Sequence, residues 1–153
     1  MSKPKVYIVS ILIPLLVGGI IAWITSSQME AFENLNQPAL SPPGILFPIV
    51  WSILYILMGV SYAILKTNDL VDDKVNRIYY LQLLVNALWS IIFFNLQWRL
   101  FAFFWLLLLI GLVIAMIVIF YKKKKIAGLL QIPYLVWCAF AAYLNMAIYL
   151  LNG

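Results

Sequence analysis

The chain has 153 residues, of which 66% are hydrophobic and only 10% are charged. A water-soluble domain of this size cannot cover so much apolar surface with polar groups, so the composition excludes an ordinary soluble protein. The formal net charge of +5 would suggest nucleic-acid binding in a soluble protein. In a membrane protein, basic residues instead gather on connections that face anionic lipid headgroups. We therefore expect membrane lipids as partners and no nucleic acid.

Five long apolar runs divide the chain, and none of them contains a charged side chain. Each has the roughly 20 residues that a helix needs to cross about 30 Å of hydrocarbon. We therefore predict an all-α integral membrane bundle, folded as a single domain over residues 1–153, with five transmembrane helices. The predicted helices cover approximately residues 6–27, 45–65, 78–97, 100–121 and 127–151.

Basic residues fall on alternate connections between these runs. Nine of the ten Lys and Arg residues precede the first run or lie in the second and fourth connections. The opposite side has only Arg99. Such a bias in short loops predicts a cytoplasmic N-terminus and an external C-terminus. A multi-pass protein of the bacterial cell membrane is the simplest interpretation.

The first external connection, residues 28–44, is the longest one and contains no basic residue. Its prolines fix φ angles and remove backbone donors, so most of the segment should be stiff and non-helical, with a short turn of helix at 30–35. Apolar side chains such as Phe32 and Leu40 are interspersed, which favours a segment that folds back as a lid over the bundle. An ordinary ordered connector is the alternative.

Three of the runs carry aromatic and amide side chains on one helical face. Unpartnered polar groups are costly inside a membrane, so we expect these faces to point toward one another. Amides that bond across helices and a pocket for a flat apolar ligand are both consistent with the pattern. The faces comprise Trp51, Tyr55, Met58 and Tyr62 in the second run, Gln82, Asn86, Trp89 and Phe93 in the third, and Tyr134, Trp137, Ala141 and Asn145 in the fifth.

These residues, in this order, resemble the TspO/MBR family, which comprises tryptophan-rich sensory proteins and translocator proteins, also called peripheral-type benzodiazepine receptors. The resemblance covers essentially the whole chain. The loop departs from the family pattern in three places. Ala31 and Phe32 stand where the family has a Trp-Tyr pair, Gln37 replaces a lysine that could pair with a ligand carboxylate, and Leu40 replaces a tryptophan. The matching segments are Phe32-x-x-Leu35-x-Gln37-Pro38-x-x-x-Pro42-Pro43-Gly44 with Trp51, then Asn86-x-x-Trp89, and Pro133-x-x-x-Trp137-x-x-x-Ala141-x-x-x-Asn145.

The resemblance implies a receptor- or sensor-like protein that binds porphyrins (protoporphyrin IX, heme-type tetrapyrroles) and benzodiazepine- or isoquinoline-type ligands inside the bundle. No cofactor is required, since the porphyrin is the ligand, and a homodimer is expected. We expect Trp51 and Trp137 to stack on a ring system, and Asn86 to donate a hydrogen bond to it. The expected ligand-binding residues are Phe32, Pro42, Trp51, Tyr55, Asn86, Trp89, Phe93, Trp137, Ala141 and Asn145.

No catalytic or metal site can be assembled from the sequence. The chain has no histidine, and its five carboxylates all lie in predicted connections. Neither a nucleophile–base pair nor a set of metal ligands is therefore predicted. Light- and oxygen-dependent porphyrin degradation, which the resemblance also implies, stays open as an alternative. Transport of tetrapyrroles or lipids is another, although the runs show no inverted repeat and no intramembrane charge.

Overall fold

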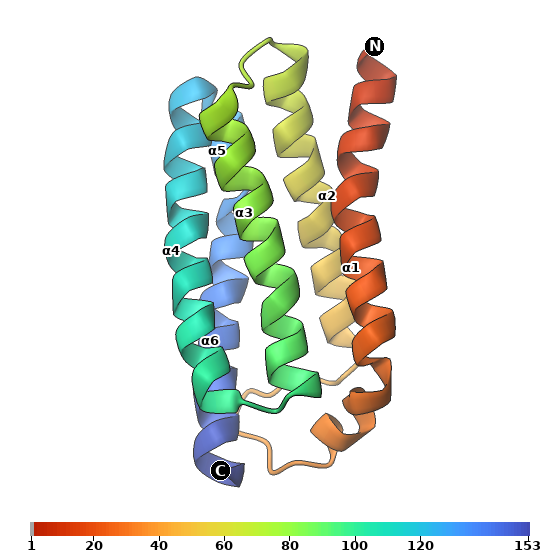
Figure 1. Cartoon of the computed structure of the whole chain (residues 1–153), viewed down its shortest axis with the longest axis vertical. Coiled ribbons are helices and arrows are strands. Elements are labelled where there is room, and N and C mark those ends of the chain that lie inside the picture. Colours follow the sequence, from red (N-terminus) through yellow and green to blue (C-terminus); the bar gives the residue numbers. More distant parts are fainter. Residues whose placement is uncertain (1) are drawn as a thin grey trace.

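The computed structural model describes residues 2–153, which form a bundle of helices with no strand in that range. The long helices run side by side, with the N- and C-termini at opposite ends (Figure 1). Five segments are long and apolar enough to cross a membrane, which confirms the predicted all-α, five-helix architecture. The elements are α1 (Lys3–Glu33), α2 (Leu46–Thr67), α3 (Asp73–Ser90), a π-helical turn η1 (Ile91–Asn95), α4 (Arg99–Lys123), α5 (Lys125–Leu129) and α6 (Ile132–Asn152).

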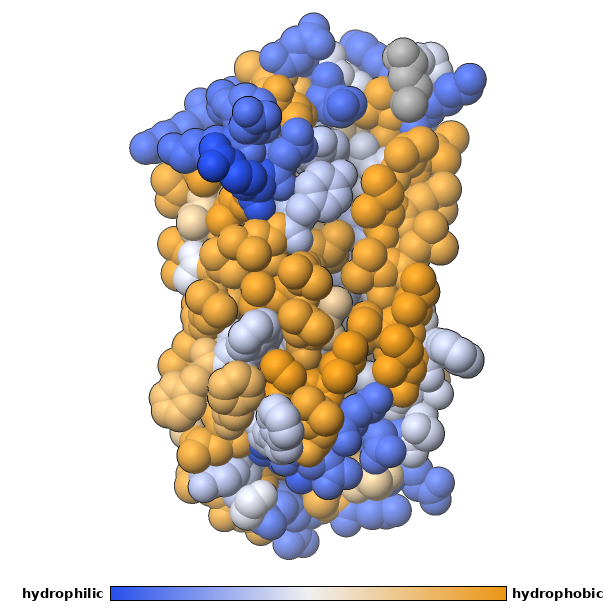
Figure 2. Space-filling model, viewed as in Figure 1, coloured by the Kyte–Doolittle hydropathy of each residue, from blue (hydrophilic) through white to orange (hydrophobic). Residues whose placement is uncertain are grey.

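The surface of the bundle has the polarity expected of a membrane-spanning protein. Apolar side chains cover the middle of the visible face, and hydrophilic ones gather at both ends (Figure 2). Large aliphatic residues such as Leu16, Ile53 and Leu108 are at least half exposed. Lipid tails can cover such side chains, whereas water would make their exposure unfavourable.

The backbones of α1 and α2 approach closely in the half of the bundle that holds the N-terminus. A Cβ atom on Gly59 would lie 2.5 Å from the Cα of Ile11 and 2.8 Å from its nitrogen. No side chain fits in that space, so glycine is required for this approach. Small residues play the same part in many membrane helix pairs.

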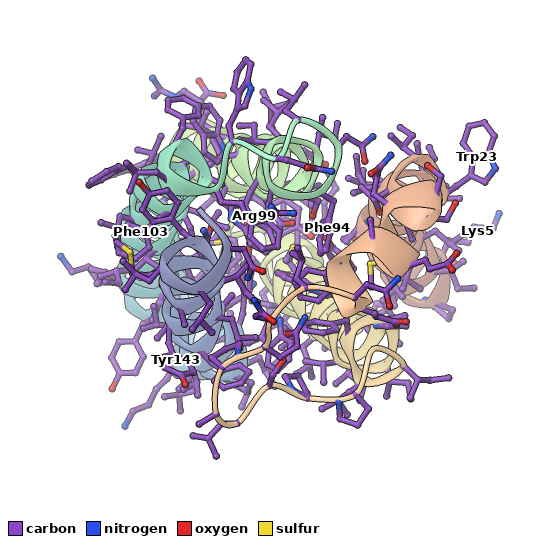
Figure 3. All side chains as sticks on the ribbon, turned by 90° about the horizontal axis from the view of Figure 1, so that it is seen from below. Lys5, Trp23, Phe94, Arg99, Phe103 and Tyr143 are labelled. Atoms are coloured by element: carbon purple, nitrogen blue, oxygen red, sulfur yellow. The ribbon has the colours of Figure 1, made fainter. Side chains whose placement is uncertain are left out.

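The first helix is longer than predicted and takes in the beginning of the predicted loop 28–44. No proline or glycine occurs from residue 26 until Pro38, so nothing stops the helix earlier. It ends where the Asn34 N–H donates to the Glu30 carbonyl at 3.1 Å. Its last turns and the remaining connection, residues 34–45, cross the end of the bundle (Figure 3).

This connection is tied to the C-terminal end of α6. The Asn36 N–H donates to the Asn152 side chain at 3.0 Å, and the Tyr143 hydroxyl donates to the Ala39 carbonyl at 2.5 Å. Leu40, expected to fold back onto the bundle, is 81% exposed instead. The connection 34–45 is therefore structured, and hydrogen bonds to α6, not packing of Leu40, fix its position.

Two of the predicted helices are not uniform α-helices. The third changes to π-helical geometry at Ile91–Asn95, a local widening that is often found at functional sites. The fifth is divided into α5 and α6. Pro133 explains that break, because proline has no N–H to donate to the preceding turn and suits the first turn of a new helix.

Candidate ligand-binding cavity

A cavity of about 600 Å³ lies between α1, α2, the α3–η1 junction and α6, in the half of the bundle that holds the C-terminus. Its lining is mainly apolar and aromatic. Most of the residues that the sequence predicted for one site do lie around one cavity, although they come from four separate segments of the chain. Eight of the ten expected ligand-binding residues line it, namely Phe32, Trp51, Tyr55, Trp89, Phe93, Trp137, Ala141 and Asn145.

Aromatic rings form two walls of the cavity. On one side, Trp51 stacks on Tyr55, with ring centroids 5.6 Å apart, and meets Trp137 edge-on at 6.4 Å and 87°. On the other, Trp89 and Phe93 are stacked at 5.3 Å with their planes only 11° apart. Trp89 lies at the end of α3 and Phe93 in η1, and their spacing of four residues across this junction brings the two rings onto one face. The walls thus present both ring faces and ring edges.

Phe32 lines the cavity at the end of the bundle that holds the C-terminus. It projects from the last turn of α1 and is only 4% exposed. Its ring meets Phe47, Phe93 and Phe94 edge-on, with centroids 5.9, 5.8 and 5.3 Å apart. Edge-to-face pairs of this kind are stabilising. These contacts fix the end of α1 to α2 and η1.

A chain of buried hydrogen bonds lies behind the wall that Trp51 and Tyr55 form. The Tyr55 hydroxyl donates to Asn86 Oδ1 at 3.0 Å, and Asn86 Nδ2 donates to the Tyr134 hydroxyl at 2.7 Å. Tyr134 in turn donates to Gln82 Oε1 at 2.7 Å. Asn86 therefore lies behind Tyr55 and outside the cavity lining, with both amide atoms bonded to protein. This network joins α2, α3 and α6 and fixes the orientation of Tyr55.

The non-aromatic polar side chains that line the cavity are one carboxylate, four hydroxyls and one amide, those of Glu33, Thr25, Ser26, Ser52, Ser90 and Asn145. Asn145 accepts from Trp89 Nε1 at 3.1 Å and donates to the Arg99 carbonyl at 2.7 Å, so its amide links α3, α6 and α4. The indole nitrogen of Trp137 is buried and has no hydrogen-bond partner. With so little accessible surface, this nitrogen does not face the empty cavity.

Pro42 lies apart from this cavity. It lines a second, more open hollow under the outer loop, together with other loop residues. Phe32, Glu33 and Gly44 line both hollows, so the two are neighbours. The structure thus places Pro42 in the neighbouring hollow and Asn86 behind the wall, and neither lines the cavity.

The contribution of α1 was missed from the sequence. The signal was present, because small and hydroxyl side chains recur on one face of an otherwise bulky apolar run. Several of the lining residues on α1 and α2 are also exposed, among them Gly19, Ala22 and Ser52, so the cavity opens sideways between these helices. The residues of α1 that line it are Leu15, Gly18, Gly19, Ile21, Ala22, Thr25, Ser26, Met29, Phe32 and Glu33.

Fold and cavity together define a multi-pass integral membrane protein with a ligand-sized aromatic site inside its helix bundle. The sequence model of the TspO/MBR family matches residues 10–151, and the chain belongs to this family. Comparison with individual proteins agrees. A tryptophan-rich protein TspO from Archaeoglobus fulgidus is 38% identical, over 95% of this chain and 96% of its own.

More distant relatives carry names that refer to sensing and translocation. A tryptophan-rich sensory protein from Cereibacter sphaeroides is 33% identical over 80% of this chain and 77% of its own. The human translocator protein is 33% identical over 83% of this chain and 78% of its own. The alignments extend over most of every chain, so the family assignment concerns the whole bundle.

Proposed function

We propose that the protein is a receptor- or sensor-like membrane protein that binds porphyrins and other flat, largely apolar ligands, including benzodiazepine- and isoquinoline-type molecules. The observation that carries this proposal is the aromatic lining. Trp51 and Trp137 meet at 87°, and the Trp89–Phe93 stack also lines the cavity. A volume of about 600 Å³ lies within the range of small-molecule sites, roughly 300–1,000 Å³.

The proposed mode of binding is stacking with a few polar contacts. A planar ring system gains from face and edge contacts with the indole rings, beyond the area that it buries. The hydroxyls of Thr25, Ser52 and Ser90, which line the cavity, supply the polar contacts. Ala141 matters because it is small and lines the space that a ring would fill. The names of the sensory and translocator relatives agree with a membrane protein that responds to a ligand.

We further propose a bacterial cell membrane location, with the N-terminus cytoplasmic and the C-terminus outside. The charge distribution supports this orientation, because nine of the ten basic residues lie at the end of the bundle that holds the N-terminus. The loop 34–45, at the end of the bundle nearer the cavity, then faces outward. A homodimer is proposed from the family resemblance, with the small residues Gly111 and Ala115 on α4, or Ala87 on α3, at the contact.

Binding of protoporphyrin IX to the purified protein in lipid nanodiscs tests this function. Trp51→Ala, Trp137→Ala and Ala141→Leu should each weaken binding about tenfold or more, because 1.4 kcal/mol is a factor of ten and each change alters the aromatic wall or its space. Trp23→Ala is the matched control, since Trp23 is 78% exposed and points away from the bundle (Figure 3). Unchanged affinity in all three folded variants would show that the site is elsewhere.

Light-dependent porphyrin breakdown is the second candidate. The observation that favours it is that three oxidisable indoles, those of Trp51, Trp89 and Trp137, line one cavity. Loss of porphyrin absorbance under illumination, compared with darkness and with the Trp51→Ala variant, separates binding from breakdown. A loss that is the same with and without protein would refute this second function.

A further inference from the structure

One charged side chain lines the cavity, and it is an acid. Glu33 is the last residue of α1, and its side chain is exposed. It lines both the aromatic cavity and the neighbouring, more open hollow under the connection 34–45. Its carboxylate is therefore within reach of a ligand in either space.

The Glu33 carboxylate lies directly over the backbone of Gly44. A Cβ atom at Gly44 would collide with Glu33 Oε1, at the end of that side chain. Gly44 also lines both hollows, so this contact lies at their boundary. Glycine thus leaves room for the carboxylate at the point where the cavity meets the outer loop.

No cation forms an ion pair with this carboxylate. Within residues 2–153 the one ion pair joins Lys123 to Asp72, at the end of the bundle that holds the N-terminus. Arg99, the one basic residue at the other end, does not line the cavity. Gln37, which stands where the family pattern has a lysine, is neutral. The boundary of the cavity therefore carries a negative charge without a basic partner.

The walls beside Glu33 also favour a cation over an anion, because the negative face of an aromatic ring attracts positive charge. Phe32, the residue before Glu33, meets Phe47 edge-on at 5.9 Å, and Phe47 meets Trp137 at 6.0 Å. A protonated amine beside Glu33 would therefore lie near these rings as well as near the carboxylate. A ligand carboxylate in the same place would be repelled by Glu33.

We propose that Glu33 sets the charge preference of the cavity, so that a flat aromatic ligand with a protonated amine binds better than the same ring system with a carboxylate. This inference rests on the proposed function, since it concerns the same cavity, and it adds the charge class of the ligands. The ring system occupies the space between the aromatic walls, and the ammonium group donates to the Glu33 carboxylate at the boundary. Such charge-assisted hydrogen bonds are stronger than neutral ones.

Three derivatives of protoporphyrin IX test this preference, because they share one ring system and differ in charge. They are the free diacid, the dimethyl ester and the bis-amide with ethylenediamine, which carries two ammonium groups near neutral pH. Each is titrated into wild type, Glu33→Gln and Glu30→Gln in nanodiscs of zwitterionic lipid. The ratio of wild-type to variant affinity is compared for each derivative, because its partition into the lipid is then the same on both sides.

We expect Glu33→Gln to weaken binding of the amine derivative about fivefold and to strengthen binding of the diacid, while the ester is unchanged. A change of this size is the upper end for an exposed ion pair, and it should shrink in high salt. Glu30→Gln is the matched control, since it removes an exposed carboxylate that lies about one helical turn earlier and lines neither hollow. It should leave all three affinities as in wild type.

The ester serves as the folding control within each variant. An equal change for all three derivatives in Glu33→Gln would make Glu33 structural and overturn the inference. An equally large loss of amine binding in Glu30→Gln would also overturn it, because the effect would then come from the general charge of this end of the bundle. If wild type binds the ester and Glu33→Gln changes no affinity, the charge preference is refuted and the proposed function stands. Wild type that binds none of the three refutes both.

Discussion

Replacing Gly59 by alanine tests how closely α1 must pack on α2. A Cβ atom at this position would lie 2.5 Å from the Cα of Ile11 and 2.8 Å from its nitrogen. Both obstacles belong to the backbone, so no side-chain rotation can relieve the contact. The two helices would have to separate, which would also shift the α1 wall of the cavity.

Two opposing contributions decide how Gly59→Ala changes the free energy of unfolding. Alanine in the interior of a helix is more favourable than glycine by about 0.5–1 kcal/mol. Forcing an extra carbon into packed space costs typically about 1–3 kcal/mol. The net loss for Gly59→Ala should be about 1–2 kcal/mol in the free energy of unfolding. Gly111→Ala is the matched control within one chain, because nothing lies within 4 Å of its added Cβ. Both variants are compared at a micelle excess that keeps the chain monomeric, because Gly111 is also a proposed dimer contact.

Unfolding by increasing dodecyl sulfate in mixed micelles, followed by tryptophan fluorescence, measures both variants. Gly111→Ala should be as stable as wild type or more stable by up to about 1 kcal/mol, whereas Gly59→Ala should be less stable. Porphyrin affinity, measured in parallel, should fall only in Gly59→Ala. If Gly59→Ala matches Gly111→Ala in stability, the close approach of α1 and α2 is refuted.

Three further predictions concern topology, pH and assembly. In a Cys138→Ala background, a cysteine at Asn34 should react with an impermeant thiol reagent outside intact cells and one at Lys124 should not; reversed labelling would contradict the orientation. Hydrogen bonds from Lys123, at 2.6 Å, and from a backbone N–H lower the pKa of the Asp72 carboxyl. Wild type should therefore be more stable than Asp72→Asn near neutral pH, and this difference should fade as the pH falls below about 4. A difference that persists in acid would show that the Asp72–Lys123 pair is not its cause. The mass of the protein in nanodiscs should correspond to a homodimer, and a monomer under mild conditions would refute that assembly.

The five-helix bundle was predictable because a hydropathy profile needs only the residue types in their order along the chain. Each span of about 20 apolar residues has few alternatives in a bilayer, so the five helices follow from the sequence. The inward faces also followed, since a polar or aromatic residue such as Trp89 or Asn145 avoids lipid when a neighbouring helix offers a partner. The extension of α1 to Glu33 did not follow, because loop and helix have similar polarity there.

Asn86 illustrates what periodicity cannot determine. Helical spacing correctly placed it on the buried face of α3, where it is 1% exposed. Whether an inward amide meets a ligand or another side chain depends on which neighbour reaches it first. In the structure, the hydroxyls of Tyr55 and Tyr134 take both of its polar atoms. That outcome depends on the rotation and separation of three helices, which a single sequence does not encode locally.

The sideways opening between α1 and α2 changes what a dissociation constant means for this protein. Exposed lining residues such as Gly19 and Ser52 place the cavity in contact with the bilayer. The reservoir for an apolar ligand is then the lipid phase, and the effective concentration is moles of ligand per mole of lipid. Adding empty vesicles at constant total ligand would dilute that reservoir. Affinities expressed per volume of buffer would therefore drift with lipid content, whereas affinities expressed as mole fractions would stay constant.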